Sequence, residues 1–264
     1  MAEQVLTANP DDYYVLIHAA DIAARCGNAS SAEGAYRRAE SMEPTASAPL
    51  AGLIDLFAAT GKLDAAKAIL ERAQASTLRG DQAKLHRAKL AYFCSSGDCN
   101  AAFDAASLYY SASPSPNTLL HCVRSFLASK CKDCAERFLQ RHRSAEPTGL
   151  ELIAMGWVHH ANERYEEAAA SFRLSWPFLV QDASSLEAAA DTFLKLRSLN
   201  EAERAVEEFL RISAPKPWAV QSLAFLRLYQ HRNSEALEAA TLLEKLEPSN
   251  PSPGTIRAFL NNKG

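Results

Sequence analysis

Cys131 and Cys134 form the chain's one Cys-x-x-Cys motif, Cys131-Lys132-Asp133-Cys134. Such a pair supplies two of the four ligands that a structural zinc ion needs. Cys94 and Cys99 fall in or near a neighbouring predicted turn, so a composite cysteine site is one alternative. Free thiols and a disulfide in the turn are the others, and they are favoured because half a zinc motif is a weak signal.

Two further groups of residues could in principle do chemistry. His159 and His160 are adjacent, so on a helix they point in different directions, and they lack the Glu and the i,i+4 histidine of a metalloprotease helix. Glu166 and Glu167 open a predicted helix, where acidic side chains favour the helix dipole. The sequence has no Gly-rich phosphate loop, nucleophile elbow or triad order. We therefore expect no enzyme, no catalytic residue, no cofactor and no metal.

The elements that would position these residues repeat with a period of about 34 residues. The frame begins as Gly27, Ala32, Tyr36, Ala39 and Pro44, and later copies keep its spacing. The copies are Gly61-Ala66-Leu70-Ala73, Gly97-Ala102-Ala106-Tyr109-Pro114, Ala135-Leu139-Pro147, Ala168-Phe172, Ala202-Val206-Phe209 and Ala236-Ala240-Leu243-Pro248. A fixed period of this length indicates a stack of small units, which usually presents a binding surface.

Each unit has the pattern of a helix-turn-helix hairpin. Apolar residues at steps of three and four precede each frame, as in Leu119, Cys122, Val123 and Phe126, and share one helix face. A turn residue that tolerates positive φ follows, and then a second helix whose alanine marks a close crossing. Prolines near the unit ends stop the second helix.

These residues together resemble the tetratricopeptide repeat family over nearly the whole chain. The turn glycine is replaced in four repeats, by Lys130, Glu163, Arg197 and His231, and the signature Trp of the first helix is absent. A pentatricopeptide array, with a period one residue longer, is the near neighbour. The resemblance implies an all-α, right-handed superhelical solenoid of helical hairpins with a C-terminal capping helix.

The frame predicts one solenoid domain over residues 1–264, built from seven repeats. Their predicted ranges are 13–46, 47–80, 83–116, 116–149, 149–182, 183–216 and 217–250, followed by a capping helix at 253–262. Ile256, Phe259 and Leu260 make one apolar stripe on that last helix, which suits a cap. Residues 3–10 resemble the tail of a second helix, as in a domain cut from a longer array.

Composition limits the partners. A formal net charge of -3 gives no electrostatic footprint for nucleic acid. No stretch approaches the ~20 apolar residues of a membrane span, and no secretory signal opens the chain. Six irregularly placed cysteines indicate reduced thiols. We therefore expect a cytoplasmic protein.

The resemblance also implies that first helices line a concave groove. Early repeats would offer a smooth surface of Ala48, Ala51, Gly52, Asp55, Ala58, Ala59, Ala88 and Ala91. Later repeats would offer large aromatic and charged side chains, the composition of interface hot spots. The predicted partner-binding groove consists of His121, Arg124, Trp157, His160, Asp191, Lys195, Trp218, Phe225 and Tyr229. Packing between repeats is the alternative role for the tryptophans.

The leading hypothesis is a non-enzymatic scaffold or adaptor that holds a peptide or helix of a partner protein in this groove. Binding of chaperone C-terminal carboxylate tails is not expected, because no repeat restores the required Lys and Asn. The corresponding positions are Ile17 and Asp21, Ala51 and Asp55, and Arg87 and Ala91.

Two alternatives remain. One is a structural subunit of a large assembly, since Met155-Gly156-Trp157, Tyr165, Ala168-Ala169 and Trp176 are similar to a tetratricopeptide subunit of intraflagellar transport complex A. The other is an RNA-binding helical-repeat protein, which would need a basic concave stripe that the predicted groove lacks.

Overall fold

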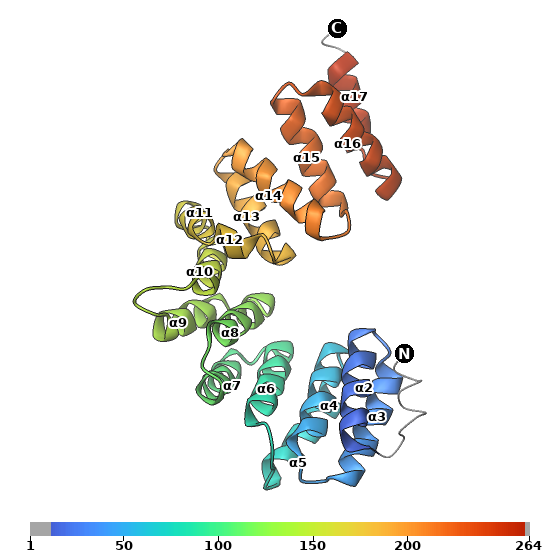
Figure 1. Cartoon of the computed structure of the whole chain (residues 1–264), viewed down its shortest axis with the longest axis vertical. Helices are drawn as coiled ribbons and strands as arrows, with labels where there is room; N and C mark the ends of the chain where they lie inside the picture. Colours follow the sequence, from blue (N-terminus) through green and yellow to red (C-terminus); the bar gives the residue numbers. More distant parts are fainter. Residues whose placement is uncertain (1–11, 262–264) are drawn as a thin grey trace. The chain divides into compact units, whose positions relative to one another are not determined.

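The computed structural model describes residues 12–261, and its named secondary-structure elements are α-helices joined in antiparallel pairs (Figure 1). The chain divides into two compact units, the first ending at Arg143 and the second beginning at Ser144. The predicted helix tail at 3–10 lies outside the described residues. One continuous domain over the whole chain stays a prediction.

The first unit contains four hairpins, one in each of the first four predicted repeats. Their helices are α2 (Tyr13–Arg25) with α3 (Ala29–Met42), α4 (Ser47–Ala59) with α5 (Leu63–Ala75), α6 (Gln82–Ser96) with α7 (Cys99–Ala112), and α8 (Pro116–Ala128) with α9 (Lys132–His142).

The second unit contains three hairpins and a terminal helix. Its helices are α10 (Gly149–Ala161) with α11 (Tyr165–Leu174), α13 (Ala183–Lys195) with α14 (Leu199–Ile212), α15 (Pro217–Tyr229) with α16 (Asn233–Leu246), and α17 (Ser252–Asn261). A four-residue helix, α12 (Trp176–Leu179), lies between α11 and α13 and was not expected from the repeat frame.

The turn inside each hairpin has the same left-handed backbone whether or not its residue is glycine. The φ angles are 77° at Gly27, 73° at Gly61 and 79° at Gly97, then 63° at Lys130, 61° at Glu163, 56° at Arg197 and 61° at His231. A left-handed residue lets the chain reverse directly after the first helix. The four replacements that the sequence placed at the glycine position therefore occupy the same turn.

The small residue of each second helix lies at a close helix crossing, as predicted. Seven alanines share this position and have no exposed surface: Ala32, Ala66, Ala102, Ala135, Ala168, Ala202 and Ala236. Glycines on two first helices make further close approaches. A Cβ atom added to Gly156 would lie 2.4 Å from Cε1 of Phe172, and one added to Gly52 would lie 2.3 Å from the Tyr36 ring.

The terminal helix α17 packs on the last hairpin, but it does so with two of its three predicted apolar residues. Ile256 is fully buried, and Leu260 packs against the apolar cluster of α15 and α16. Phe259 is 44% exposed, which corrects the expected three-residue stripe. On a helix, Phe259 lies to one side of the face that Ile256 and Leu260 share, so the closer pair takes the core. No helix within residues 12–261 combines the length and hydropathy that crossing a membrane requires.

Candidate functional site

Three of the predicted groove residues gather at one cavity in the second unit. Trp218, Phe225 and Tyr229 lie on α15 and line a cavity of about 770 Å³ with Leu194 and Leu199 of the preceding hairpin. We call it the aromatic cavity. Arg197, Gln221, Ser222 and Leu226 complete its lining.

The helical repeat explains why these α15 side chains share one surface. Positions 218, 221, 222, 225 and 229 recur at steps of three and four, which is one face of a helix. Trp218 also packs on Phe209 of α14, with ring centroids 4.8 Å apart, and is only partly open. Tyr229 is 70% exposed. One aromatic ring of the cavity, Trp218, is therefore fixed by packing, and another, Tyr229, is exposed and can contact a ligand.

Other predicted residues of the second unit form a polar cluster instead. His160 of α10 shares a 2.9 Å hydrogen bond between its Nδ1 and the Thr192 hydroxyl, and its Nε2 lies 3.6 Å from the Asp191 carboxylate. Asp191 and Lys195 are exposed on α13. These three residues do not line the aromatic cavity.

Trp157 is predicted to face a partner in the groove. In the structure its side chain is buried, with only 7% of its surface exposed. It lies on α10 among Ile153, Ala154 and Val158, which are also buried. Burial of the indole is consistent with the alternative role named for the tryptophans, packing inside the array.

His121 and Arg124 lie on α8 and therefore belong to the first unit. The His121 ring meets Tyr109 of α7 edge to face, with centroids 5.9 Å apart. Two of the nine predicted residues thus belong to the first unit and seven to the second, and a groove made of all nine stays a prediction.

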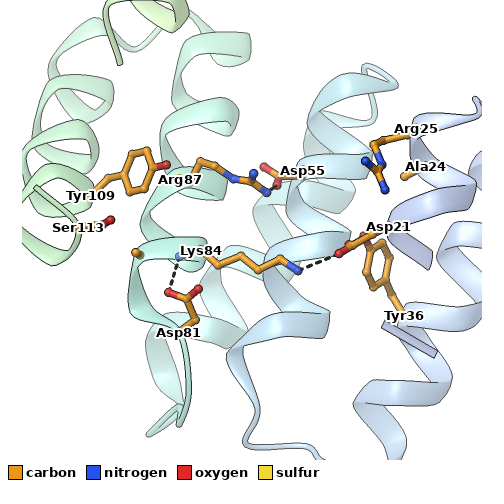
Figure 2. A pocket seen from close by; sticks show the side chains of 11 residues that line it. Asp21, Ala24, Arg25, Tyr36, Asp55, Asp81, Lys84, Arg87, Tyr109 and Ser113 are labelled. Carbon is orange, nitrogen blue, oxygen red and sulfur yellow. Dashed lines mark hydrogen bonds and ion pairs between the residues drawn. The ribbon is translucent and has the colours of Figure 1, made fainter. Parts of the chain in front are cut away.

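The first unit has a cavity that the sequence did not predict, of about 620 Å³ (Figure 2). We call it the charged cavity. Of the expected smooth surface, Ala51, Gly52, Ala58 and Ala88 are buried, whereas Asp55 lines this cavity. Most of the lining is charged or phenolic, and the full set is Asp21, Ala24, Arg25, Tyr36, Asp55, Asp81, Ala83, Lys84, Arg87, Tyr109 and Ser113.

Two ion pairs cross the charged cavity from α6, one to the preceding first helix and one to the first helix before that. Lys84 Nζ of α6 lies 3.3 Å from Asp21 Oδ2 of α2, and Arg87 Nη2 lies 2.7 Å from Asp55 Oδ2 of α4, as Figure 2 shows. The Tyr36 hydroxyl donates a 2.5 Å hydrogen bond to Asp21 Oδ1. These pairs connect three repeats through side chains that lie on the same face.

Burial raises the pKa of Asp55 above its ordinary value, although the charge and hydrogen bond of Arg87 act in the opposite direction. Three carboxylates and three basic side chains line the cavity, so its formal charges balance. The sequence contains a signal for the charged cavity, because Asp21 and Asp55 occupy the same repeat position one period apart.

The expectation of free thiols holds for four of the six cysteines but not for Cys99 and Cys131. Cys131 is joined by a disulfide to Cys99, one repeat earlier, and neither stays a free thiol nor pairs within its own motif. The two residues open α9 and α7 at equivalent turns, and adjacent repeats bring their Cα atoms within 6.0 Å. Cys26, Cys94, Cys122 and Cys134 remain free. Within the described part of the chain, no group of three or more Cys, His, Asp or Glu side chains could hold a metal ion.

Comparison with known proteins gives matches by structure. No family model matches the sequence, and no curated protein sequence does. A tetratricopeptide repeat protein of Parabacteroides merdae superposes with a TM-score of 0.52 at 16% identity, over 92% of this chain and 96% of that one. Pseudomonas aeruginosa PilF gives 0.61 at 14% identity, over 94% and 97%.

The chain has the tetratricopeptide repeat fold. A chain of the Cut9–Hcn1 hetero-tetramer of the APC/C is similar as well, with a TM-score of 0.60 and 12% identity. That match covers 97% of this chain but only 50% of the other. At identities this low, the structural matches establish the fold alone.

Proposed function

We propose that this tetratricopeptide repeat protein is a non-enzymatic scaffold that binds a peptide or helix of a partner protein at the aromatic cavity. The supporting observation is the grouping of Trp218, Phe225 and Tyr229 around about 770 Å³ of open space. Aromatic side chains carry much of the binding energy at protein interfaces because they bury large areas with few rotatable bonds.

The chemistry of the cavity favours an apolar or aromatic anchor on the partner. Leu194 and Leu199 give an apolar wall, and Arg197 and Gln221 add polar groups to the lining. An apolar centre with a polar rim is the usual anatomy of a specific interface. The predicted residues outside the cavity, His121, Arg124, His160, Asp191 and Lys195, would contribute through charge if the partner extends to them.

A role as a subunit of a larger assembly is the second candidate. Two exposed apolar side chains close in sequence favour it: Leu174 is 70% exposed and Phe178 of α12 is 50% exposed. Chaperone carboxylate tails are not proposed as ligands, because Asp21 and Asp55 stand where the carboxylate clamp requires Asn. RNA is not proposed either, because Lys84 and Arg87 are paired with carboxylates there.

A selection from a random peptide library on the purified full chain tests the proposal. Selected peptides should carry an aromatic or branched apolar residue, and Phe225→Ala or Tyr229→Ala should weaken their binding about 30-fold, the effect of a hot spot worth ~2 kcal/mol. Phe259→Ala is the matched control, because Phe259 is an exposed aromatic residue outside the cavity. If the selected peptides bind both cavity variants as they bind the parent, the aromatic cavity is not the site.

A cytoplasmic location stays a prediction. The Cys99–Cys131 disulfide is a feature more common in oxidising compartments, so it argues for a different setting. Trapping free thiols in intact cells would show the redox state that the protein meets.

A further inference from the structure

Three cysteines meet where two successive hairpin turns stack in the first unit. Cys99 is the first residue of α7, and Cys131 is the N-cap residue of α9. Their disulfide links the α6–α7 hairpin to the α8–α9 hairpin. The Cys134 thiol donates to the carbonyl oxygen of Cys99 over 3.5 Å, so the third sulfur lies beside the disulfide.

Helix geometry also brings Cys134 close to Cys131. Side chains at the N-cap and at the third helical position face each other at the start of a helix, as capping boxes show. Cys131 and Cys134 occupy these two positions of α9, and each has only 6% of its surface exposed. The Cys134 thiol therefore contacts the backbone of Cys99 and shares the first turn of α9 with Cys131.

We propose that Cys134 exchanges with this disulfide, converting the link between two repeats into a local Cys131–Cys134 disulfide within α9. The inference is independent of the proposed binding function. It uses only groups that the structure brings together. It also gives both cysteines of the Cys-x-x-Cys motif a role, which neither a metal site nor a permanent Cys99–Cys131 disulfide does.

The step is a thiol–disulfide exchange and needs no added oxidant. The Cys134 thiol loses its proton, and the thiolate attacks Sγ of Cys131. The Cys131–Cys134 bond forms as the Cys99–Cys131 bond breaks, and the electron pair leaves on Cys99 Sγ, which takes up a proton. The number of disulfides and free thiols is the same before and after.

Burial raises the pKa of the Cys134 thiol, while the positive charge of Arg137 acts in the opposite direction. Exchange depends on the thiolate fraction. We therefore expect the exchange to be slow in the closed turn and to follow its local opening.

Exchange would release the two turns without separating the hairpins. The rings of Phe103, Phe126 and Phe138 pack between α7, α8 and α9, with centroid separations of 5.6–6.2 Å. This contact does not depend on the cysteines. The α8–α9 turn would become free to move while α8, which carries His121 and Arg124, stays packed.

Labelling the oxidised full chain with N-ethylmaleimide in the absence of any reductant tests the proposal. Without exchange, Cys99 cannot react, because it stays in its disulfide. With exchange, Cys99 becomes labelled over time while a Cys131–Cys134 link accumulates. Digestion with trypsin and Asp-N cuts between every pair of neighbouring cysteines from Cys94 to Cys134, so mass spectrometry can locate each label and link.

We expect Cys99 to be labelled at least ten-fold faster in the parent than in Cys134→Ser, with Cys134→Ala as a second variant and circular dichroism as the check of folding. Cys94→Ser is the matched control and should behave as the parent, since Cys94 is another partly buried free thiol of the same hairpins. Three results would overturn the proposal: Cys99 stays unlabelled in the parent, Cys99 is labelled equally fast in both Cys134 variants, or all six cysteines are labelled at once.

Discussion

At the residue scale, the four turns without glycine hold strained backbone that lowers the stability of the chain. Lys130, Glu163, Arg197 and His231 all have positive φ. The left-handed conformation costs a residue with a Cβ about 1–2 kcal/mol. The surrounding hairpins must supply that energy, because the turn cannot change without displacing both helices.

Replacing such a residue by glycine should therefore stabilise the protein. We expect Glu163→Gly and His231→Gly each to raise the free energy of unfolding by about 0.5–1 kcal/mol, since relief of strain exceeds the entropy that glycine adds to the unfolded chain. Urea denaturation measures the change. Gly61→Ala is the converse control and should destabilise; equal midpoints for all three variants would show that these turns carry no strain.

At the element scale, the start of α10 shows how a local motif anchors the second unit. Thr148 and Glu151 form a capping box, and the buried Glu151 carboxylate also accepts hydrogen bonds from the backbone nitrogen and hydroxyl of Ser144. Burial alone would raise the pKa of Glu151, but these hydrogen bonds outweigh it and lower the pKa below its ordinary value. The charged form is the one that the folded unit holds.

This gives stability a predictable dependence on pH. Because the pKa is lower in the folded state, the stabilisation is complete above the ordinary value of 4.5 and is lost as pH falls through the lower folded-state pKa. We expect Glu151→Gln to destabilise the second unit by about 2 kcal/mol at neutral pH and by less in acid. Urea titrations followed by tryptophan fluorescence on both sides of pH 4.5 measure this. If Glu151→Gln lowers the free energy of unfolding equally at every pH, the charge of Glu151 is not what stabilises the second unit.

At the scale of the whole molecule, each unit has its own apolar core. One cluster joins α2 to α6 through residues such as Leu53 and Phe57, and another joins α15 to α17 around Ile256. Repeat proteins are held by contacts between neighbouring repeats, so separate stretches can differ in stability. The three tryptophans, Trp157, Trp176 and Trp218, all belong to the second unit.

Removing the Cys99–Cys131 disulfide should therefore lower the stability of the first unit only. Circular dichroism should detect this change, and tryptophan fluorescence should not. The disulfide spans a sequence separation of 32, for which the chain-entropy relation gives about 3–4 kcal/mol. We expect the Cys99→Ser, Cys131→Ser double variant to shift the circular dichroism transition of the first unit to lower urea. Tryptophan fluorescence should keep its midpoint. A common shift of both signals would show that the chain unfolds as one body.

The sequence by itself determined the hairpins, their turns and the small residues at their crossings. These features follow from local rules: a period of two helices, a residue at positive φ, and an alanine where two backbones approach. It also located Trp218, Phe225 and Tyr229 on one helix face, because spacing along a single helix is local information.

Only the tertiary structure decided which of the facing residues stay open. Trp157 and Phe225 both lie on first helices. Trp157 is buried on α10, whereas Phe225 lines a cavity on α15. The charged cavity joins Asp21 to Lys84, two repeats away, and the disulfide joins Cys131 to Cys99 rather than to Cys134. Such pairings depend on how successive repeats stack, and that distance and rotation are set by side-chain volumes across the interface rather than by the spacing within a repeat.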